Sequence, residues 1–170
     1  MKHVGTSANA SDVATMRNLN SPFGAPTLTN NTVATTETVV ARWSIPANAL
    51  ANGDELDLRL IGQVSSTATL TFRIRFGTAG TTADALLGAF VVSAAGVANA
   101  HHLLEALVAM LSATTATATG SSQLASGVVG LVTAAFAAAT VNLTVANFLS
   151  ITLVQSAAQT YTSRAAKLSW

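Results

Sequence analysis

The chain has 170 residues, of which 50% are hydrophobic and 9% are charged, and its net charge is +1. This length is enough for one domain with a sizeable core and argues against a second full domain. The near-neutral charge, without clusters of lysine or arginine, argues against a nucleic-acid partner, and the absence of cysteine excludes disulfides, a thiol nucleophile and thiolate zinc sites.

Charged residues make up 9% of this chain, against about 25% in a typical soluble domain. The surface must therefore consist largely of alanine, threonine, serine and asparagine. A weakly charged surface of small residues suits permanent burial against another copy or another protein. We therefore expect an oligomer.

Neither a membrane span nor a secretion signal is indicated. The stretch Gly5 to Asn20 is polar and lacks the hydrophobic segment of a signal peptide. We therefore expect a protein made in the cytoplasm, without a membrane partner. The most apolar stretch, Leu86 to Leu111, is too interrupted for a transmembrane helix, because it contains Ser93, Asn99, His101, His102 and Glu105.

Residues 1–36 are polar, show little hydrophobic periodicity and contain the turn-favouring pairs Ser21-Pro22 and Asn30-Asn31. We predict an extended N-terminal arm over 1–36 and a β-sandwich domain over 37–170. Such an arm would become ordered when it adds a strand to a neighbouring subunit or crosses its surface. The arm residues that we expect at a partner interface are Pro22, Phe23 and Pro26.

The first strand carries its apolar residues on one face and ends at Pro46, because proline cannot donate to a sheet ladder. Those residues are Val39, Ala41, Trp43 and Ile45, and we expect Trp43 to anchor the core. Asn52-Gly53 then favours a tight turn into the next strand.

Two further strands alternate strictly between apolar and polar residues. Such alternation is typical of antiparallel sheets with one buried face and one solvated face. The turn between the two strands is predicted over Gly62 to Thr67. In the strand that follows Asn52-Gly53, the inward residues are Leu56, Leu58 and Leu60, and the outward residues are Glu55, Asp57 and Arg59. In the strand after it, the inward residues are Leu70, Phe72, Ile74 and Phe76, and the outward residues are Thr71, Arg73 and Arg75. The predicted core anchors are Trp43, Leu56, Leu58, Phe72 and Ile74.

Leu86 to Val92 reads as another strand, but His101 to Leu111 is ambiguous. As a helix, it would carry an apolar stripe from Leu103 to Leu111. As a strand, it would align His102, Leu104, Ala106, Val108 and Met110 on one face. We favour the strand because its surroundings are β-rich.

The alanine- and threonine-rich stretch Ser112 to Thr140 fits either a flexible loop or flat strands, and the alternation over Thr115 to Thr119 favours strands. A long last strand with a bend near Asn147 is predicted from Val141 to Leu153, and the tail to Trp170 is mixed. About eight short strands indicate an all-β antiparallel sandwich, jelly-roll-like in size and spacing.

Two segments resemble small structural proteins of tailed bacteriophages. These proteins share an opening in which IPA is followed by a leucine and then by GD, matched here within Trp43 to Asp54, and a strand of the form TL.FR.RFG, matched from Thr69 to Gly77. The resemblance covers Val39 to Gly77, and beyond that only the rhythm of strands and turns agrees. The alanine-rich middle and the long polar arm depart from the family pattern.

The resemblance implies a virion component made in the host cytoplasm. Its implied role is a jelly-roll capsid decoration or cement protein, commonly a homotrimer, that binds the major capsid protein or neighbouring virion proteins. The alternative is a tail or fibre component that recognises a host glycan or joins tail proteins. The shortage of exposed aromatic residues favours the decoration role.

No enzyme, metal or cofactor signature is found in the sequence. The adjacent His101 and His102 would point to opposite faces of a strand, and His3 is distant in sequence. Asp54, Glu55 and Asp57 lack the further oxygen ligands of a calcium loop. No histidine or carboxylate partner is evident for Ser121, Ser122 or Ser126. We therefore predict no catalytic, cofactor or metal residues.

Arg73 and Arg75 share an exposed face of one strand. They would either bind carboxylates of a partner protein or pair within the sheet with Glu55 or Asp57. We retain both arginines as candidate interface residues, although pairing within the sheet is favoured. Trp170 is either docked on the domain or free.

Overall fold

The structure is a computed structural model that describes residues 23–66, 68–92, 99–124 and 138–170. These residues form ten strands and no helix. The strands are β1 (Thr27–Leu28), β2 (Thr38–Ile45), β3 (Glu55–Val64), β4 (Leu70–Gly77), β5 (Ala85–Val92), β6 (His101–Ser112), β7 (Thr115–Leu124), β8 (Ala139–Thr140), β9 (Asn147–Gln155) and β10 (Tyr161–Ser169).

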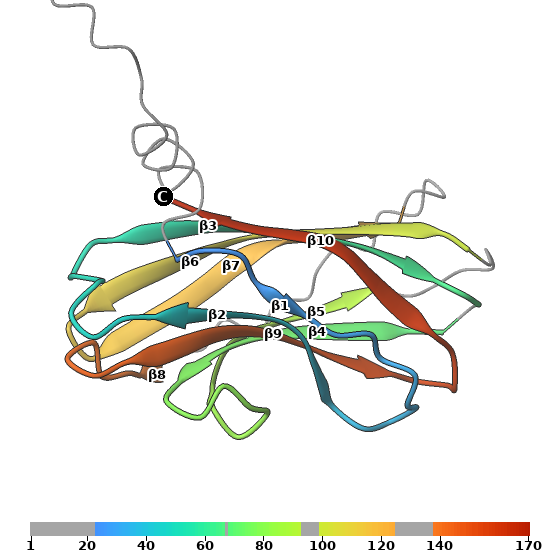
Figure 1. The fold of residues 1–170 in the computed structure, drawn as a ribbon, viewed down its shortest axis with the longest axis horizontal. Coiled ribbons are helices and arrows are strands. Elements are labelled where there is room, and N and C mark those ends of the chain that lie inside the picture. The colour runs from blue at the N-terminus through green and yellow to red at the C-terminus, as the bar shows by residue number, and fades with distance from the viewer. Residues whose placement is uncertain (1–22, 67, 93–98, 125–137) are drawn as a thin grey trace, which may run out of the picture.

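The strands form two five-stranded sheets that lie one above the other (Figure 1). Sheet A has the order β1-β2-β9-β4-β5, and sheet B has the order β10-β3-β6-β7-β8. All pairings within the two sheets are antiparallel. The predicted all-β antiparallel sandwich is confirmed, and so is the strand assignment of His101 to Leu111.

The jelly-roll connectivity and the extended arm are not confirmed. Residues 1–22 lie outside the described residues, and the rest of the predicted arm runs along the sandwich. Thr27 pairs with Arg42 of β2. Asn31, only 1% exposed, exchanges backbone hydrogen bonds with Tyr161 of β10. The chain therefore joins the two sheets at this edge before β2 begins.

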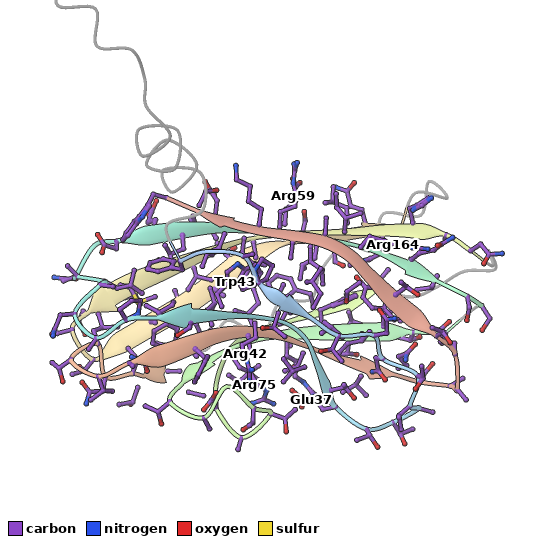
Figure 2. The ribbon with its side chains drawn as sticks, viewed as in Figure 1. Glu37, Arg42, Trp43, Arg59, Arg75 and Arg164 are labelled. Atoms are coloured by element: carbon purple, nitrogen blue, oxygen red, sulfur yellow. The ribbon has the colours of Figure 1, made fainter. Side chains whose placement is uncertain are left out.

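The core lies between the sheets and follows the alternation of the sequence. In β3 and β4 every second residue is buried, beginning with Leu56 and Leu70. The five expected core anchors are each at most 2% exposed. Figure 2 shows the Trp43 side chain between the two sheets, with Arg59 and Arg75 on opposite outer faces.

Two predicted details are wrong at the level of single residues. The register of β2 against β9 shifts between Val39 and Ala41, so both Val40 and Ala41 are buried and Val39 is not. Such a bulge moves one residue out of the alternation. Gly62 lies inside β3 rather than in a turn, because its missing side chain leaves room for the ring of Tyr161.

The end of the chain also differs from the prediction. The last long strand does not begin at Val141, because asparagine side chains hold a turn there. The Asn142 side chain accepts from the Thr144 amide, and the Asn147 side chain donates to the carbonyl of Asn142. Such side chains compete with the sheet ladder. β10 was not predicted, because its register shift between Ser163 and Ala165 breaks the alternation.

Candidate interaction surfaces

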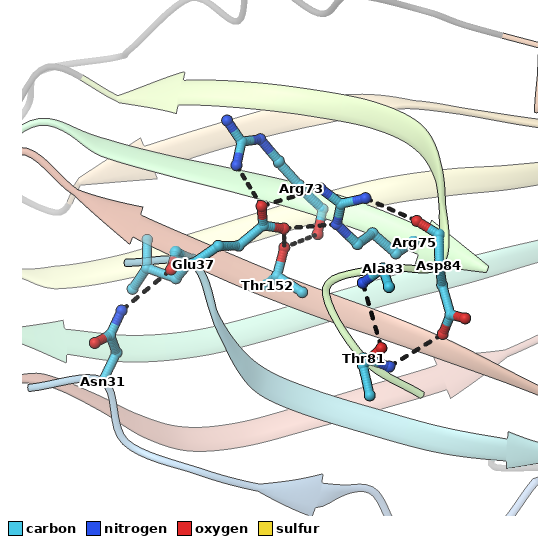
Figure 3. Close-up of polar contacts among 9 residues, drawn as sticks. Asn31, Glu37, Arg73, Arg75, Thr81, Ala83, Asp84 and Thr152 are labelled. Carbon is cyan, nitrogen blue, oxygen red and sulfur yellow. Dashed lines mark hydrogen bonds and ion pairs between the residues drawn. The ribbon is translucent and has the colours of Figure 1, made fainter. Parts of the chain in front are cut away.

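A cluster of charged side chains covers the outer face of sheet A (Figure 3). Glu37 immediately precedes β2 and accepts hydrogen bonds from Arg73 Nη1 at 2.5 Å and from Arg75 Nε at 2.6 Å. A further bond from Arg75 Nη2, at 3.0 Å, makes the second pair bidentate. The hydroxyl of Thr152 in β9 also donates to Glu37. One carboxylate therefore ties β4 and β9 to the start of β2.

The environment of Glu37 keeps it ionised. Burial by itself would raise the pKa of the carboxyl. The hydrogen bonds from Arg75 and Thr152, together with the charges of Arg75 and Arg73, lower this pKa by a larger total amount. The net effect is a pKa below the usual value. The cluster is therefore a permanent ion-pair network near neutral pH.

Glu37 replaces the partners that we predicted for the two arginines. Glu55 and Asp57 lie in β3 of sheet B, so neither can reach Arg73 or Arg75 across the core. That part of the prediction is wrong, because alternation along a strand does not say to which sheet the strand belongs. Both arginines are satisfied within the chain, although the Arg73 side chain remains 31% exposed.

A second polar cluster lies inside the sandwich, around His102. Its Nε2 atom is 2.5 Å from Ser122 Oγ, and its Nδ1 atom is 3.3 Å from Tyr161 OH. The imidazole stacks on the ring of Phe72, with centroids 4.2 Å apart and planes within 9°. A Cβ on Gly62 would lie 2.1 Å from Tyr161 OH, so only glycine fits there.

Burial controls the charge of this inner cluster. It lowers the pKa of His102 from 6.5 to about 3 and raises that of Tyr161. Both rings are therefore neutral near pH 7. Ser122 is 0% exposed and His102 is 1% exposed, so a substrate cannot reach either side chain. The serine-histidine pair thus joins β6 to β7 inside the core.

The partnership of Ser122 with His102 was not predicted, although the residue order contains a signal for it. Ser122 continues the inward parity of Ala116 and Ala118, and His102 continues that of Leu104. Two polar residues at inward positions of consecutive strands predict a buried hydrogen bond. His101 is exposed on the opposite face of β6, as predicted. Among the described residues, no group of three or more potential metal ligands occurs.

The outer face of sheet B carries a groove of about 500 Å³ over β10, β3, β6 and β7. Its lining includes Asp57, Arg59, Glu105 and Lys167, together with Leu107 and hydroxyl-bearing side chains of β7 and β10. Arg59 and Glu105 form an ion pair across neighbouring strands. The groove therefore combines an internal ion pair, one further acid and one further base.

The remaining candidates lie away from both sheet faces. Phe23 packs against the core and contacts the ring of Trp170, with centroids 5.8 Å apart. Trp170 is thus docked on the domain, although 51% of it is exposed. Pro26 is half-buried, and Pro22, His3 and Ser126 lie outside the described residues. The Asp54 side chain accepts from the Ala51 amide and holds the turn before β3.

Comparison of the chain with protein-family models, with curated proteins and with solved structures finds no match. In the described part of the chain, no helix is long and apolar enough to cross a membrane. The function must therefore be argued from the residues themselves.

Proposed function

We propose that this chain is a structural protein of a tailed-bacteriophage particle, a decoration or cement protein that binds the head as a trimer. The resemblance to such proteins covers Val39 to Gly77, which forms the consecutive strands β2, β3 and β4. These strands cross from sheet A to sheet B and back, so the resembling segment contributes to both halves of the core.

The observation that carries the proposal is how the polar side chains are used. Glu37 is bonded to two arginines and a threonine from other strands. His102 is bonded to Ser122 and Tyr161 inside the core. In both clusters the titratable groups hold strands together, and those of the inner cluster are closed off from solvent, which favours a mechanical role.

The position of Phe23 supports a role for the preceding residues in attachment. Phe23, the first described residue, packs against the core and contacts the ring of Trp170. Residues 1–22 therefore precede a fixed point on the domain surface. We assign to them the binding of the major capsid protein, by strand addition or by crossing its surface.

The first test is the mass of the purified protein by light scattering, followed by co-sedimentation with phage shells that lack it. The proposal expects a trimer that sediments with the shells. A monomer that stays in the supernatant would overturn it and favour a tail or glycan-recognition role.

A further inference from the structure

The outer faces of the two sheets differ in whether their charged side chains have partners. On sheet A, both Arg73 and Arg75 are bonded to Glu37. On sheet B, the groove is lined by Asp57 and Lys167, whose side chains make no hydrogen bond or ion pair with other described residues. They lie on neighbouring strands, since Lys167 pairs with Arg59 and Ser169 pairs with Asp57.

The same outer face also carries apolar side chains, on β3 and β6. Ile61 faces outward from β3 with 38% of its surface exposed, and it pairs directly with Leu103 of β6. Leu107 lies two residues after Glu105 on the same face of β6, pairs with Asp57 and is half-buried. Outward leucines on a central strand are unusual for a solvated sheet face, which normally carries polar residues. The face therefore has the composition of an interface, with apolar residues beside a few charges.

We infer that this face is the contact between copies of the chain. The two unpaired charges have opposite signs, so Asp57 of one copy can pair with Lys167 of the next while Ile61, Leu103 and Leu107 lose their contact with water. Four strands about 4.8 Å apart and about ten residues long cover roughly 600 Å². A stable interface buries about 800 Å² per partner, so this face supplies most of the area of one contact. In a trimer the three faces would lie around a common axis, and each would be divided between two neighbours.

The inference deepens the proposed function and rests on it only for the number of copies. The molecular mass of the purified protein in solution tests it, and no phage shells are needed. Light scattering across a concentration series is expected to show an oligomer for the parent and a monomer for Leu107→Arg. The added guanidinium can face Asp57 within one copy, so the fold is expected to survive, and a thermal melt checks this.

A charge exchange tests the pairing itself. Asp57→Lys and Lys167→Asp each place like charges opposite one another and should raise the dissociation constant about tenfold or more, while the double variant should restore it. Ser44→Lys is the control, because Ser44 is exposed on β2 of sheet A, away from this face, and should leave the mass unchanged.

Three results would overturn the inference. These are a monomeric parent, a folded Leu107→Arg variant of unchanged mass, and an effect of Ser44→Lys as large as that of Asp57→Lys. A monomeric parent would leave the groove open to a ligand such as a glycan. If the oligomer behaves as expected but does not bind shells, the decoration role fails and the contact surface stands.

Discussion

At the scale of single residues, the large buried side chains differ in whether their polar atoms have hydrogen-bond partners. Among the described residues, Trp43 contributes the largest fully buried side chain, and its indole nitrogen has no hydrogen-bond partner there. Its contribution is therefore packing and burial of apolar area. His102, by contrast, has a partner at each ring nitrogen but must remain neutral.

Trp43→Ala is expected to lower the free energy of unfolding by about 3 to 5 kcal/mol, because it empties a large core site. Chemical denaturation measures this loss. Trp170→Ala is the matched control, since Trp170 is 51% exposed and its loss should cost much less. A midpoint for Trp43→Ala equal to that of the parent would show that the site is not filled by the indole.

The stability of the fold should depend on pH through His102. The folded state holds its pKa at about 3, whereas the unfolded chain takes up a proton near pH 6.5. Stability is therefore full above about pH 6.5 and falls toward pH 3, by about 1.4 kcal/mol per pH unit for one proton. Denaturation measurements between pH 7 and about pH 5 give the slope of the free energy of unfolding against pH. This window lies above the pH range in which ordinary carboxyl groups titrate.

Two variants isolate this effect. His102→Gln should flatten the slope, because the buried titratable group is gone, even if the variant is less stable overall. His101→Gln should leave the slope as in the parent, since His101 is exposed on the other face of the same strand. Identical slopes for all three proteins would exclude His102 as the cause.

At the level of elements, side chains from distant parts of the sequence fix how the strands meet. Glu37 joins β4 and β9 to the start of β2 on the outer face of sheet A. Tyr161 lies over Gly62 and so sets the position of β10 against β3. Neither contact follows from the alternation pattern of a strand.

Glu37→Gln should destabilise the fold by about 1 to 3 kcal/mol, because two guanidinium groups lose their shared counter-charge and remain next to each other. The Glu37 side chain is only 16% exposed, so water replaces the lost bonds poorly. Urea denaturation gives the value. Glu55→Gln, at an exposed position of β3, should change stability by less than about 0.5 kcal/mol. Equal losses in the two variants would contradict a special role for the cluster.

At the scale of the whole molecule, the chain before β2 has two parts with different expected roles. Residues from Thr27 onward pair with the sandwich, and the Asn31 side chain donates to the carbonyl of Leu153 in the core. Residues 1–22 are proposed to bind the shell. The proposed boundary between the sandwich and the attachment segment is therefore moved from residue 36 to a point before β1.

Two truncations test this boundary. Removing residues 1–22 should leave the melting temperature and the oligomer unchanged and abolish co-sedimentation with shells. Removing residues 1–36 should in addition destabilise the domain, because β1 and Asn31 are lost. Shell binding at full occupancy after removal of residues 1–22 would contradict the proposed role of this segment.

The sequence by itself determined the class of fold and the inward face of most strands. Alternation in β3 and β4 assigned Leu56, Leu58, Phe72 and Ile74 to the core without knowledge of any partner strand. This works because side chains of a strand alternate between two faces, so burial of one face is recorded locally in the residue order.

Only the tertiary structure decided which strands are neighbours and which charges meet. Strand order decides that Glu37 meets Arg75 and that His102 meets Ser122. It also places Arg73 and Asp57 on different sheets. Strand order is set by contacts between residues far apart in the chain. No period within a single segment records those contacts, and the candidate surfaces of this protein are built from them.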